Sequence, residues 1–339
     1  MREIFETCEA LHDGLIPAEA LRASGMNSHA VDSLLKRGEL VRVRRGWYVL
    51  GPRWEKTGAD GRYRLFVRAT AAGAERDLMY SHHSAAVLHG LPLIGPWPQG
   101  VQAIDPDTAG GSSSRLLTTH RGPVDPSALI IDGVRVTSLS RTLIDVAATS
   151  SFLVGVTMID CVLHRESARM AVARRSGSVA APPITRATLL TELDGVHPRN
   201  GYRAAERAIT FADGLSANPG ESLGRVRFEE LGFEIPELQV RFDVGGRTYY
   251  VDYFWRGVRK IGEFDGHIKY TRAAVMAGRD IVQVVIDEKD RESVLRPEVN
   301  SFDRWVWKLA LSPSAFYRFL IDKGVPRAPT RRLHTPDSR

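Results

Sequence analysis

The chain has 339 residues, of which 43% are hydrophobic and 25% are charged, and its formal net charge at pH 7 is +6. These values are typical of a globular protein with two or three domains. No run of about 18 apolar residues predicts a membrane span. The two cysteines, Cys8 and Cys161, are too few for a disulfide framework or a cysteine-based zinc site. Residues 1–14 mix acidic with apolar side chains, unlike a secretory signal, so we expect a cytoplasmic protein.

The first 50 residues show the pattern of three short helices followed by two strands. Residues 4–12 predict the first helix, and Pro17 suits the first turn of the second. Asn27 or Ser28 can cap the third helix. This order predicts a winged helix-turn-helix over residues 1–52, with strands at residues 40–44 and 47–50.

Basic residues gather in the wing and at the end of the third helix. From Lys36 to Arg45, five residues are basic and one is acidic. Such clustering predicts contact with DNA phosphates. The residues at the start of the third helix, together with Asp32, would face the major groove. The alternative is a helix-turn-helix used only for protein contact. The residues that we expect to contact DNA are Asn27, Ser28, His29, Lys36, Arg37, Arg42, Arg44 and Arg45.

Residues 51–62 predict a linker, because they are charged and rich in glycine and proline. A second α/β unit is expected over residues 62–214. Its histidine-rich run predicts a packed helix, and the histidines more simply cap and pack than bind metal, because no carboxylate or cysteine lies at ligand spacing. These histidines are His82, His83 and His89. Strands are expected at residues 101–104, 116–120 and 134–137, and helices at 140–148, capped by Ser140, at 186–193 and at 201–212.

Two segments of the chain predict little regular structure. Residues 165–183 are rich in Arg, Ala, Ser and Pro and predict a flexible surface insertion. Contact of the arginines in this insertion with nucleic acid is one interpretation, and a solvated charge run is the simpler one. Residues 326–339 predict a disordered basic tail.

Three acidic residues stand in two strand-like runs between residues 249 and 270. Asp252 lies in the first run, and Glu263 and Asp265 lie in the second, after a basic turn at residues 256–260 that predicts a hairpin. Because Glu263 and Asp265 are two residues apart, they project from the same face of a strand. A buried carboxylate needs a cation, and hard oxygen ligands of this kind suit Mg²⁺ or Mn²⁺. We therefore expect a metal site formed by these three carboxylates.

Asp252, and Glu221 earlier in the chain, each have an alternative role. Asp252 can be explained as one half of a surface ion pair with Arg256 or Arg259. Glu221 stands in the first turn of a helix predicted over residues 218–232, where its charge is favourable. A role for Glu221 as a further ligand to metal or water beside Asp252 is equally consistent with the sequence.

Two family resemblances rest on these motifs. The first half, through residues 14–50 and the runs SHHSAAVLHGLPL and VTSLSRTLIDVA, resembles the AbiEi family, in which a winged-helix antitoxin-type domain precedes a second α/β domain. Residues 216–325, through ESLGR, VDYFW, EFDGHIKY and EKDRE, resemble the small Vsr-like endonucleases of the PD-(D/E)XK superfamily. The fused arrangement is similar to that of actinobacterial proteins that carry both parts.

The nuclease resemblance implies an α/β (α+β) fold with a mixed sheet flanked by helices, and it implies that Asp252 and Glu263 bind the metal ion. The superfamily usually has a lysine two residues after the second carboxylate, where this chain has Asp265. The resemblance implies that Lys269 or Lys289 supplies the missing charge from a shifted position. Lys289, within EKDRE, is the preferred candidate.

Two functions follow from the resemblances. The first is a metal-dependent DNA endonuclease anchored by the winged helix, acting in DNA repair or phage defence. The second, motivated by Asp265 in place of lysine, is a non-catalytic antitoxin-type regulator that binds its own promoter through a degenerate nuclease fold. Both imply DNA as a partner and a nucleoid-associated location. A nucleotidyltransferase toxin or a DNA-repair protein is the further partner that the resemblances imply.

Overall fold

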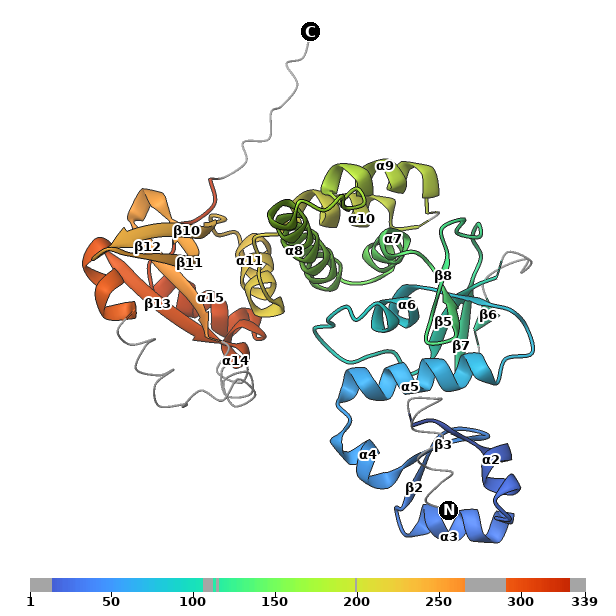
Figure 1. Ribbon diagram of the computed structural model, residues 1–339. Helices are drawn as coiled ribbons and strands as arrows, with labels where there is room; N and C mark the ends of the chain where they lie inside the picture. Colours follow the sequence, from blue (N-terminus) through green and yellow to red (C-terminus); the bar gives the residue numbers. More distant parts are fainter. Residues whose placement is uncertain (1–13, 106–111, 114–115, 199, 266–290, 330–339) are drawn as a thin grey trace. The chain divides into compact units, whose positions relative to one another are not determined.

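The computed structural model describes residues 14–105, 112–113, 116–198, 200–265 and 291–329 (Figure 1). The chain has mixed α/β structure and divides into two compact units. The first unit comprises Met1–Met158 with Ile184–Thr210, and the second comprises Ile159–Pro183 with Phe211–Arg339. The helix expected at residues 4–12, Lys269 and Lys289 lie outside the described residues.

The described part of the first unit has the predicted two helices and strand pair, preceded by a short strand that was not predicted. Pro17 lies in that strand and immediately precedes its helix, so its expected place in the first helical turn is wrong. Asn27 caps the second of these helices, since its side-chain oxygen accepts a 2.9 Å hydrogen bond from the Ala30 N–H. Apolar residues from the helices and strands form a small core, with Ile16 and Leu21 almost fully buried. The elements are β1 (Ile16–Pro17), α2 (Ala18–Ala23), α3 (Ser28–Lys36), β2 (Leu40–Arg44) and β3 (Trp47–Leu50), in a sheet of order β1-β3-β2.

The linker expected at residues 51–62 is wrong, because two helices occupy most of it. Helix α4 (Gly51–Lys56) has Pro52 in its first turn, where a helix leaves backbone N–H groups unpaired and therefore tolerates proline. Helix α5 (Ala59–Ala72) follows after two residues. Packing then joins the N-terminal elements to the rest of the unit, through the buried side chains of Leu15, Val49, Leu65 and Ala69.

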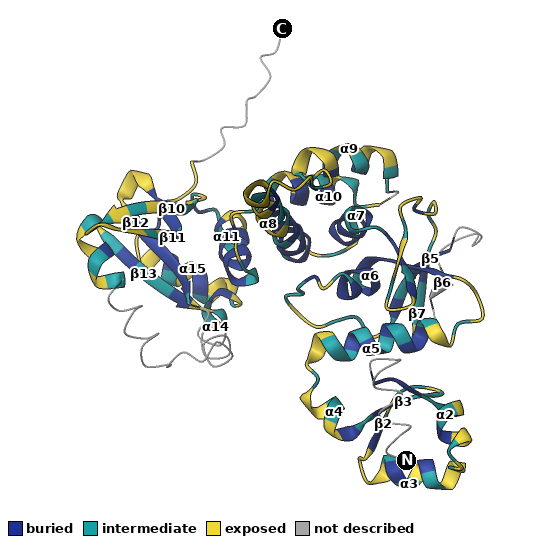
Figure 2. Cartoon of the chain, viewed as in Figure 1, coloured by how far each residue is buried: buried dark blue, intermediate teal, exposed yellow. Residues whose placement is uncertain are grey.

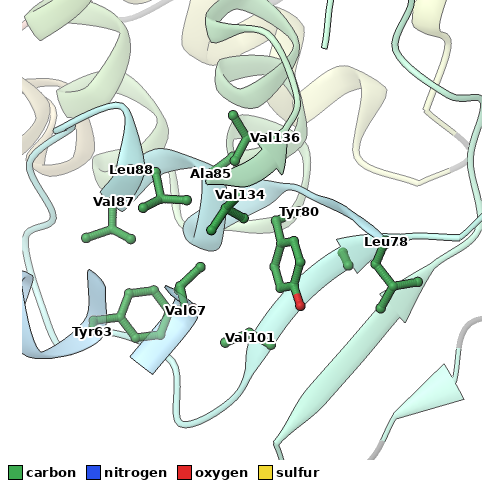
Figure 3. Close-up of a cluster of buried hydrophobic side chains, with 11 residues drawn as sticks. Tyr63, Val67, Leu78, Tyr80, Ala85, Val87, Leu88, Val101, Val134 and Val136 are labelled. Carbon is green, nitrogen blue, oxygen red and sulfur yellow. The ribbon is translucent and has the colours of Figure 1, made fainter. Parts of the chain in front are cut away.

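A six-stranded mixed sheet forms the centre of the first unit, with strand order β6-β7-β5-β4-β9-β8. Figure 3 shows its core, in which Tyr63 and Val67 of α5 and Val87 of α6 (His82–Leu88) meet side chains of the strands. The strands expected at residues 101–104, 116–120 and 134–137 are confirmed to within one residue. The strands are β4 (Met79–Tyr80), β5 (Val101–Ile104), β6 (Ser112–Ser113), β7 (Leu117–His120), β8 (Leu129–Ile131) and β9 (Val134–Val136).

Further helices follow the sheet, namely α7 (Leu139–Thr149), α8 (Phe152–Ser176), α9 (Arg186–Val196) and α10 (Tyr202–Phe211). The cap of α7 is Ser138, not Ser140 as predicted. The Ser138 hydroxyl accepts a 3.3 Å hydrogen bond from the Arg141 N–H. Both serines suit a cap by type, but Ser138 is the residue that precedes the first helical position.

The flexible insertion expected at residues 165–183 is also wrong over most of its length, because α8 continues to Ser176. Alanine and arginine, which are frequent here, have high helix propensity, and this outweighs the serines. Within the helix, Arg169 forms a 2.5 Å ion pair with Glu166. Only residues 177–183, which end in two prolines, lack regular structure.

The second unit holds a four-stranded sheet of order β10-β11-β12-β13, in which β12 and β13 are parallel and the other neighbours are antiparallel. Burial is greatest in α11 and in the inner strands (Figure 2). Rings of Phe228, Tyr253, Trp255, Trp305 and Phe316 contact one another between the sheet and the helices. The elements are α11 (Pro219–Leu231), β10 (Glu237–Val244), β11 (Arg247–Trp255), β12 (Lys260–Asp265), β13 (Ser301–Val306), α14 (Trp307–Ala310) and α15 (Pro313–Asp322).

Two glycines let α11 lie close to the sheet. A Cβ atom added to Gly220 would overlap the Phe264 ring, and one added to Gly224 would lie 2.5 Å from the Tyr253 hydroxyl oxygen. Both positions are buried in α11. Larger residues would therefore push the helix, and Glu221 with it, away from β11 and β12.

The tail predicted from residue 326 begins in an ordered part of the chain. The Pro326 carbonyl accepts a 2.9 Å hydrogen bond from the Glu234 N–H, and Arg327 forms a β-bridge with Phe233. The guanidinium of Arg327 also lies 4.6 Å from the centre of the Phe233 ring. The first residues of the expected tail are thus fixed by backbone pairing that their polar composition does not reveal, and residues 330–339 lie outside the described residues.

Candidate functional site

Asp252 lies where the regular pairing of the four-stranded sheet is interrupted. The β10–β11 register pairs the residues on either side of Gln239 and Asp252 but skips these two, and Gln239 has a φ of +49°. The β11–β12 pairing ends at Tyr253 and Gly262. Beyond that pair, the Asp252 carboxylate accepts a 2.8 Å hydrogen bond from the Phe264 N–H. A side-chain oxygen thus occupies the place that a backbone carbonyl takes in a regular ladder.

Glu263 stands opposite Asp252 when the β11–β12 register is continued by one residue. Opposite residues of an antiparallel pair direct their side chains to the same face of a sheet. The shared metal site of Asp252 and Glu263 stays a prediction. Asp265 follows on the same face of β12, because it is two residues further along the strand.

Glu263 is held by two guanidinium groups. Its side chain is 5% exposed, and it forms a 2.6 Å ion pair with Arg291 and a 3.3 Å ion pair with Arg304. Arg304 is its direct partner in the parallel register of β12 and β13. The backbone carbonyl of Tyr250 also accepts a hydrogen bond from Arg291. The buried charge of Glu263 is therefore neutralised from inside the protein.

Glu221 reaches the same part of the sheet from the first turn of α11. One of its carboxylate oxygens accepts a 2.7 Å hydrogen bond from the Ala217 N–H, and the other accepts one from the side-chain amide of Asn218. The Gln239 amide lies 3.4 Å from the Glu221 carboxylate. Both interpretations of Glu221 remain open, because it stabilises the helix start and also lies beside the interrupted pairing.

A buried charge network ties the start of α11 to α8. Asp160 accepts hydrogen bonds from the Ser222 hydroxyl at 2.8 Å and from the Asp213 N–H at 2.7 Å. Arg225 lies 3.6 Å from the same carboxylate. Burial raises the pKa of Asp160 to about 6, while the Arg225 charge opposes this shift. The network holds the helix turn that carries Glu221.

The residues of this site fit a metal ion only in part. Asp252 and Glu263 offer the hard oxygen donors that Mg²⁺ and Mn²⁺ prefer, but guanidinium groups already bind Glu263. In residues 14–105, 112–113, 116–198, 200–265 and 291–329, no three His, Cys, Asp or Glu side chains come together as a metal-binding group. A completed ligand set is therefore not present among these residues, and the metal site remains a prediction.

Sequence reasoning missed several contributors to this site. Gln239 belongs to no motif, and Tyr253 lies within VDYFW, where only Asp252 was given a role. Arg291 lay within the EKDRE run, but the neighbouring Lys289 was preferred. Arg304 has a usable signal, since it is a charged residue beside the apolar Phe302, Trp305 and Val306 of β13 and so needs a partner of opposite charge.

Most of the residues predicted to contact DNA form an exposed group in the first unit. Asn27, Ser28 and His29 are exposed at the start of α3, with the Asn27 side chain acting as the helix cap. Lys36 and Arg37 are exposed at its end, where Arg37 pairs with Glu39 at 2.5 Å. This arrangement leaves the start of α3 accessible from solvent.

The three arginines of the wing differ from one another. Arg42 is exposed and stacks over the Tyr48 ring, and Arg45 is exposed at the turn. Arg44 is partly buried, and it donates a 2.7 Å hydrogen bond to the Thr70 hydroxyl of α5. A pocket of about 200 Å³ lies between α2, α3 and the wing, and its lining includes Arg22, Arg42 and Asp32. Arg44 therefore joins the wing to α5, while Arg42 and Arg45 face solvent.

The histidines of the first unit pack as expected. The His82 ring stacks on His120 with ring centres 3.9 Å apart, and its Nδ1 lies 2.8 Å from the Ser81 hydroxyl. Burial lowers the pKa of both histidines. His89 Nε2 lies 2.8 Å from the Thr137 carbonyl oxygen and can donate to it. These rings are neutral packing elements at pH 7.

Comparison of the sequence with known protein families and with curated proteins found no match. Of the helices within the described ranges, none combines the length and the hydropathy that crossing a bilayer requires. The site must therefore be interpreted from its own geometry.

Proposed function

We propose that the protein is a metal-dependent DNA endonuclease, with a winged helix that holds DNA and a PD-(D/E)XK-type domain that cuts it. One observation supports the proposal: Asp252 lies directly beyond the last paired residues of β11 and β12, and its carboxylate accepts a hydrogen bond from the N–H of Phe264, the residue after Glu263. A break in the ladder is where carboxylate oxygens can point to a common ligand instead of being covered by backbone.

The protein's own groups would share the work of hydrolysis. The Phe264 N–H orients the Asp252 carboxylate, and the hydrogen bonds at the start of α11 orient Glu221. Mg²⁺ or Mn²⁺, when bound by Asp252 and Glu263, supplies a water of lowered pKa and stabilises charge on the phosphate. Arg304 and Arg291 offer positive charge next to these carboxylates. Asp265, on the same face of β12, is the further candidate ligand.

A cleavage assay tests this proposal. Purified protein is incubated with supercoiled, linear, mismatched and single-stranded DNA in Mg²⁺ or Mn²⁺. We expect cleavage that falls at least about 100-fold in Asp252→Asn and Glu263→Gln. Glu237→Gln is the matched control, because Glu237 is an exposed glutamate of the same sheet that pairs with Arg256. Cleavage that survives both site substitutions would refute the assignment.

A second function is favoured by the arginine pairs of Glu263. A carboxylate neutralised by two guanidinium groups, followed by Asp265 in place of lysine, suits a nuclease fold that binds DNA without cutting it. Such a protein would be an antitoxin-type regulator of its own promoter. Sequence-specific, metal-independent binding to the upstream DNA, together with no cleavage of any substrate, would support this function over the first.

A further inference from the structure

The arginines that bind Glu263 are more accessible than Glu263 itself. The side chains of Arg291 and Arg304 are 22% and 24% exposed, against 5% for Glu263. Solvent therefore reaches these two arginine side chains more readily than it reaches the Glu263 side chain. Arginine pairs with phosphate oxygens through the same planar set of N–H donors that it presents to a carboxylate.

Glu263 belongs to a chain of ion pairs. Within the described residues, a chain of ion pairs links Glu263 to Arg291 and Arg304, Arg304 to Glu292, and Glu292 to Arg296. It contains three guanidinium groups and two carboxylates. A DNA phosphate has the charge and the geometry to pair with these guanidinium groups in place of a carboxylate.

From these contacts we propose that Glu263 and a DNA phosphate compete for Arg291 and Arg304, so that DNA binding frees Glu263 to bind the divalent ion. This rests on the proposed nuclease function and adds a regulatory step to the same site. Without DNA, the guanidinium groups neutralise Glu263 and oppose metal binding. With DNA, the phosphate takes the guanidinium groups, and the released carboxylate beside Asp252 attracts a cation.

The proposal has a consequence that needs no metal. In Glu263→Gln, both arginines lose their ion pair with this carboxylate, so a DNA phosphate no longer competes with it for them. We therefore expect this variant to bind a short duplex several-fold more tightly than the wild type in EDTA, measured by fluorescence anisotropy. Glu237→Gln removes the same charge and also releases an arginine, Arg256, so it measures the general charge effect. Glu263→Gln must exceed this control.

The coupling between DNA binding and metal binding is measured with Ca²⁺, so that the measurement does not depend on cleavage. Ca²⁺ is titrated calorimetrically into the free protein and into its complex with the duplex, and the duplex alone is the blank. We expect Ca²⁺ to bind the complex at least about fivefold more tightly, and by linkage Ca²⁺ should tighten DNA binding by the same factor. Arg304→Met should raise the Ca²⁺ affinity of the free protein, whereas Arg256→Met, which changes an arginine paired with Glu237 outside this chain of ion pairs, should leave it unchanged.

The outcomes separate this inference from the proposed function. Two results would overturn the competition even if the protein cuts DNA. One is equal Ca²⁺ affinity in the free and the DNA-bound protein. The other is a DNA affinity in EDTA that rises no more in Glu263→Gln than in Glu237→Gln. The absence of any cleavage that depends on Asp252 and Glu263 overturns the nuclease function. In that case, tighter DNA binding by Glu263→Gln in the presence of EDTA would still support the exchange of arginines between carboxylate and phosphate.

Discussion

The hydroxyl of Tyr253 donates a 2.7 Å hydrogen bond to the main-chain carbonyl of Glu221. Tyr253 directly follows Asp252 on β11, so this bond ties the first turn of α11 to the strand that carries Asp252. Burial raises the pKa of Tyr253 well above its ordinary value, and the nearby Glu221 and Asp252 charges add to the rise. The hydroxyl therefore keeps its proton, and donates, throughout the neutral range.

Tyr253→Phe removes this tie while leaving the ring in place. We expect a loss of about 1 kcal/mol in the free energy of unfolding, as for a typical buried hydrogen bond. The kcat for cleavage should fall, because Glu221 loses its fixed position, while the KM for DNA stays near the wild-type value. Urea denaturation and steady-state kinetics measure the two effects. An unchanged kcat would mean that the position of Glu221 does not matter to the reaction.

Gly220→Ala should loosen the contact between α11 and β12. The added methyl group overlaps the Phe264 ring, and overpacking of a filled core costs about 1–3 kcal/mol. The matched control is Gly195→Ala, on an exposed part of α9 where an added Cβ meets nothing within 4 Å. That change should raise stability by up to about 1 kcal/mol, because alanine is the better helix former. Chemical denaturation of the two variants should therefore give shifts of opposite sign.

Asp160→Asn should change how stability depends on pH. Because burial raises the pKa of Asp160 from 3.8 to about 6, the folded protein holds this proton more tightly than the unfolded chain. Wild-type stability therefore falls as pH rises from about 4 to 6. Relative to Asp160→Asn, the wild type should lose about 3 kcal/mol across this window. Denaturation of both proteins at pH 4, 5, 6 and 7 checks this, and a stability difference that stays constant would contradict it.

The wing arginines should separate DNA binding from stability. Arg45→Ala removes an exposed charge, so we expect weaker DNA binding and a salt-dependence slope shallower by about 0.9, with unchanged stability. Arg44→Ala instead removes the hydrogen bond to Thr70, and it should cost about 1 kcal/mol of stability. Anisotropy titrations over a range of salt concentrations, with thermal melts beside them, make the comparison. Equal loss of DNA affinity in the two variants would show that Arg44 also contacts DNA.

Periodicity and turn residues were sufficient for many elements. The helix start at Asn27, the hairpin of β2 and β3, the helix after Asn218 and the strands with Asp252 and Glu263 could all be predicted, because caps, glycines and alternating apolar residues act within a few positions. The same local reasoning failed at residues 51–62 and 165–176. There, glycine, proline and serine suggested irregular structure, but the surrounding residues form stable helices.

The sequence by itself determined the acidic residues, their strands and the two-residue spacing of Glu263 and Asp265. Only the tertiary structure decided that Asp252 sits in a break of the ladder, that Gly220 and Gly224 bring Glu221 near it, and that Arg291 and Arg304 bind Glu263. The physical reason is distance along the chain. Strand and helix propensities act between near neighbours, whereas the partner of a buried charge is fixed by how strands far apart in sequence pair and pack.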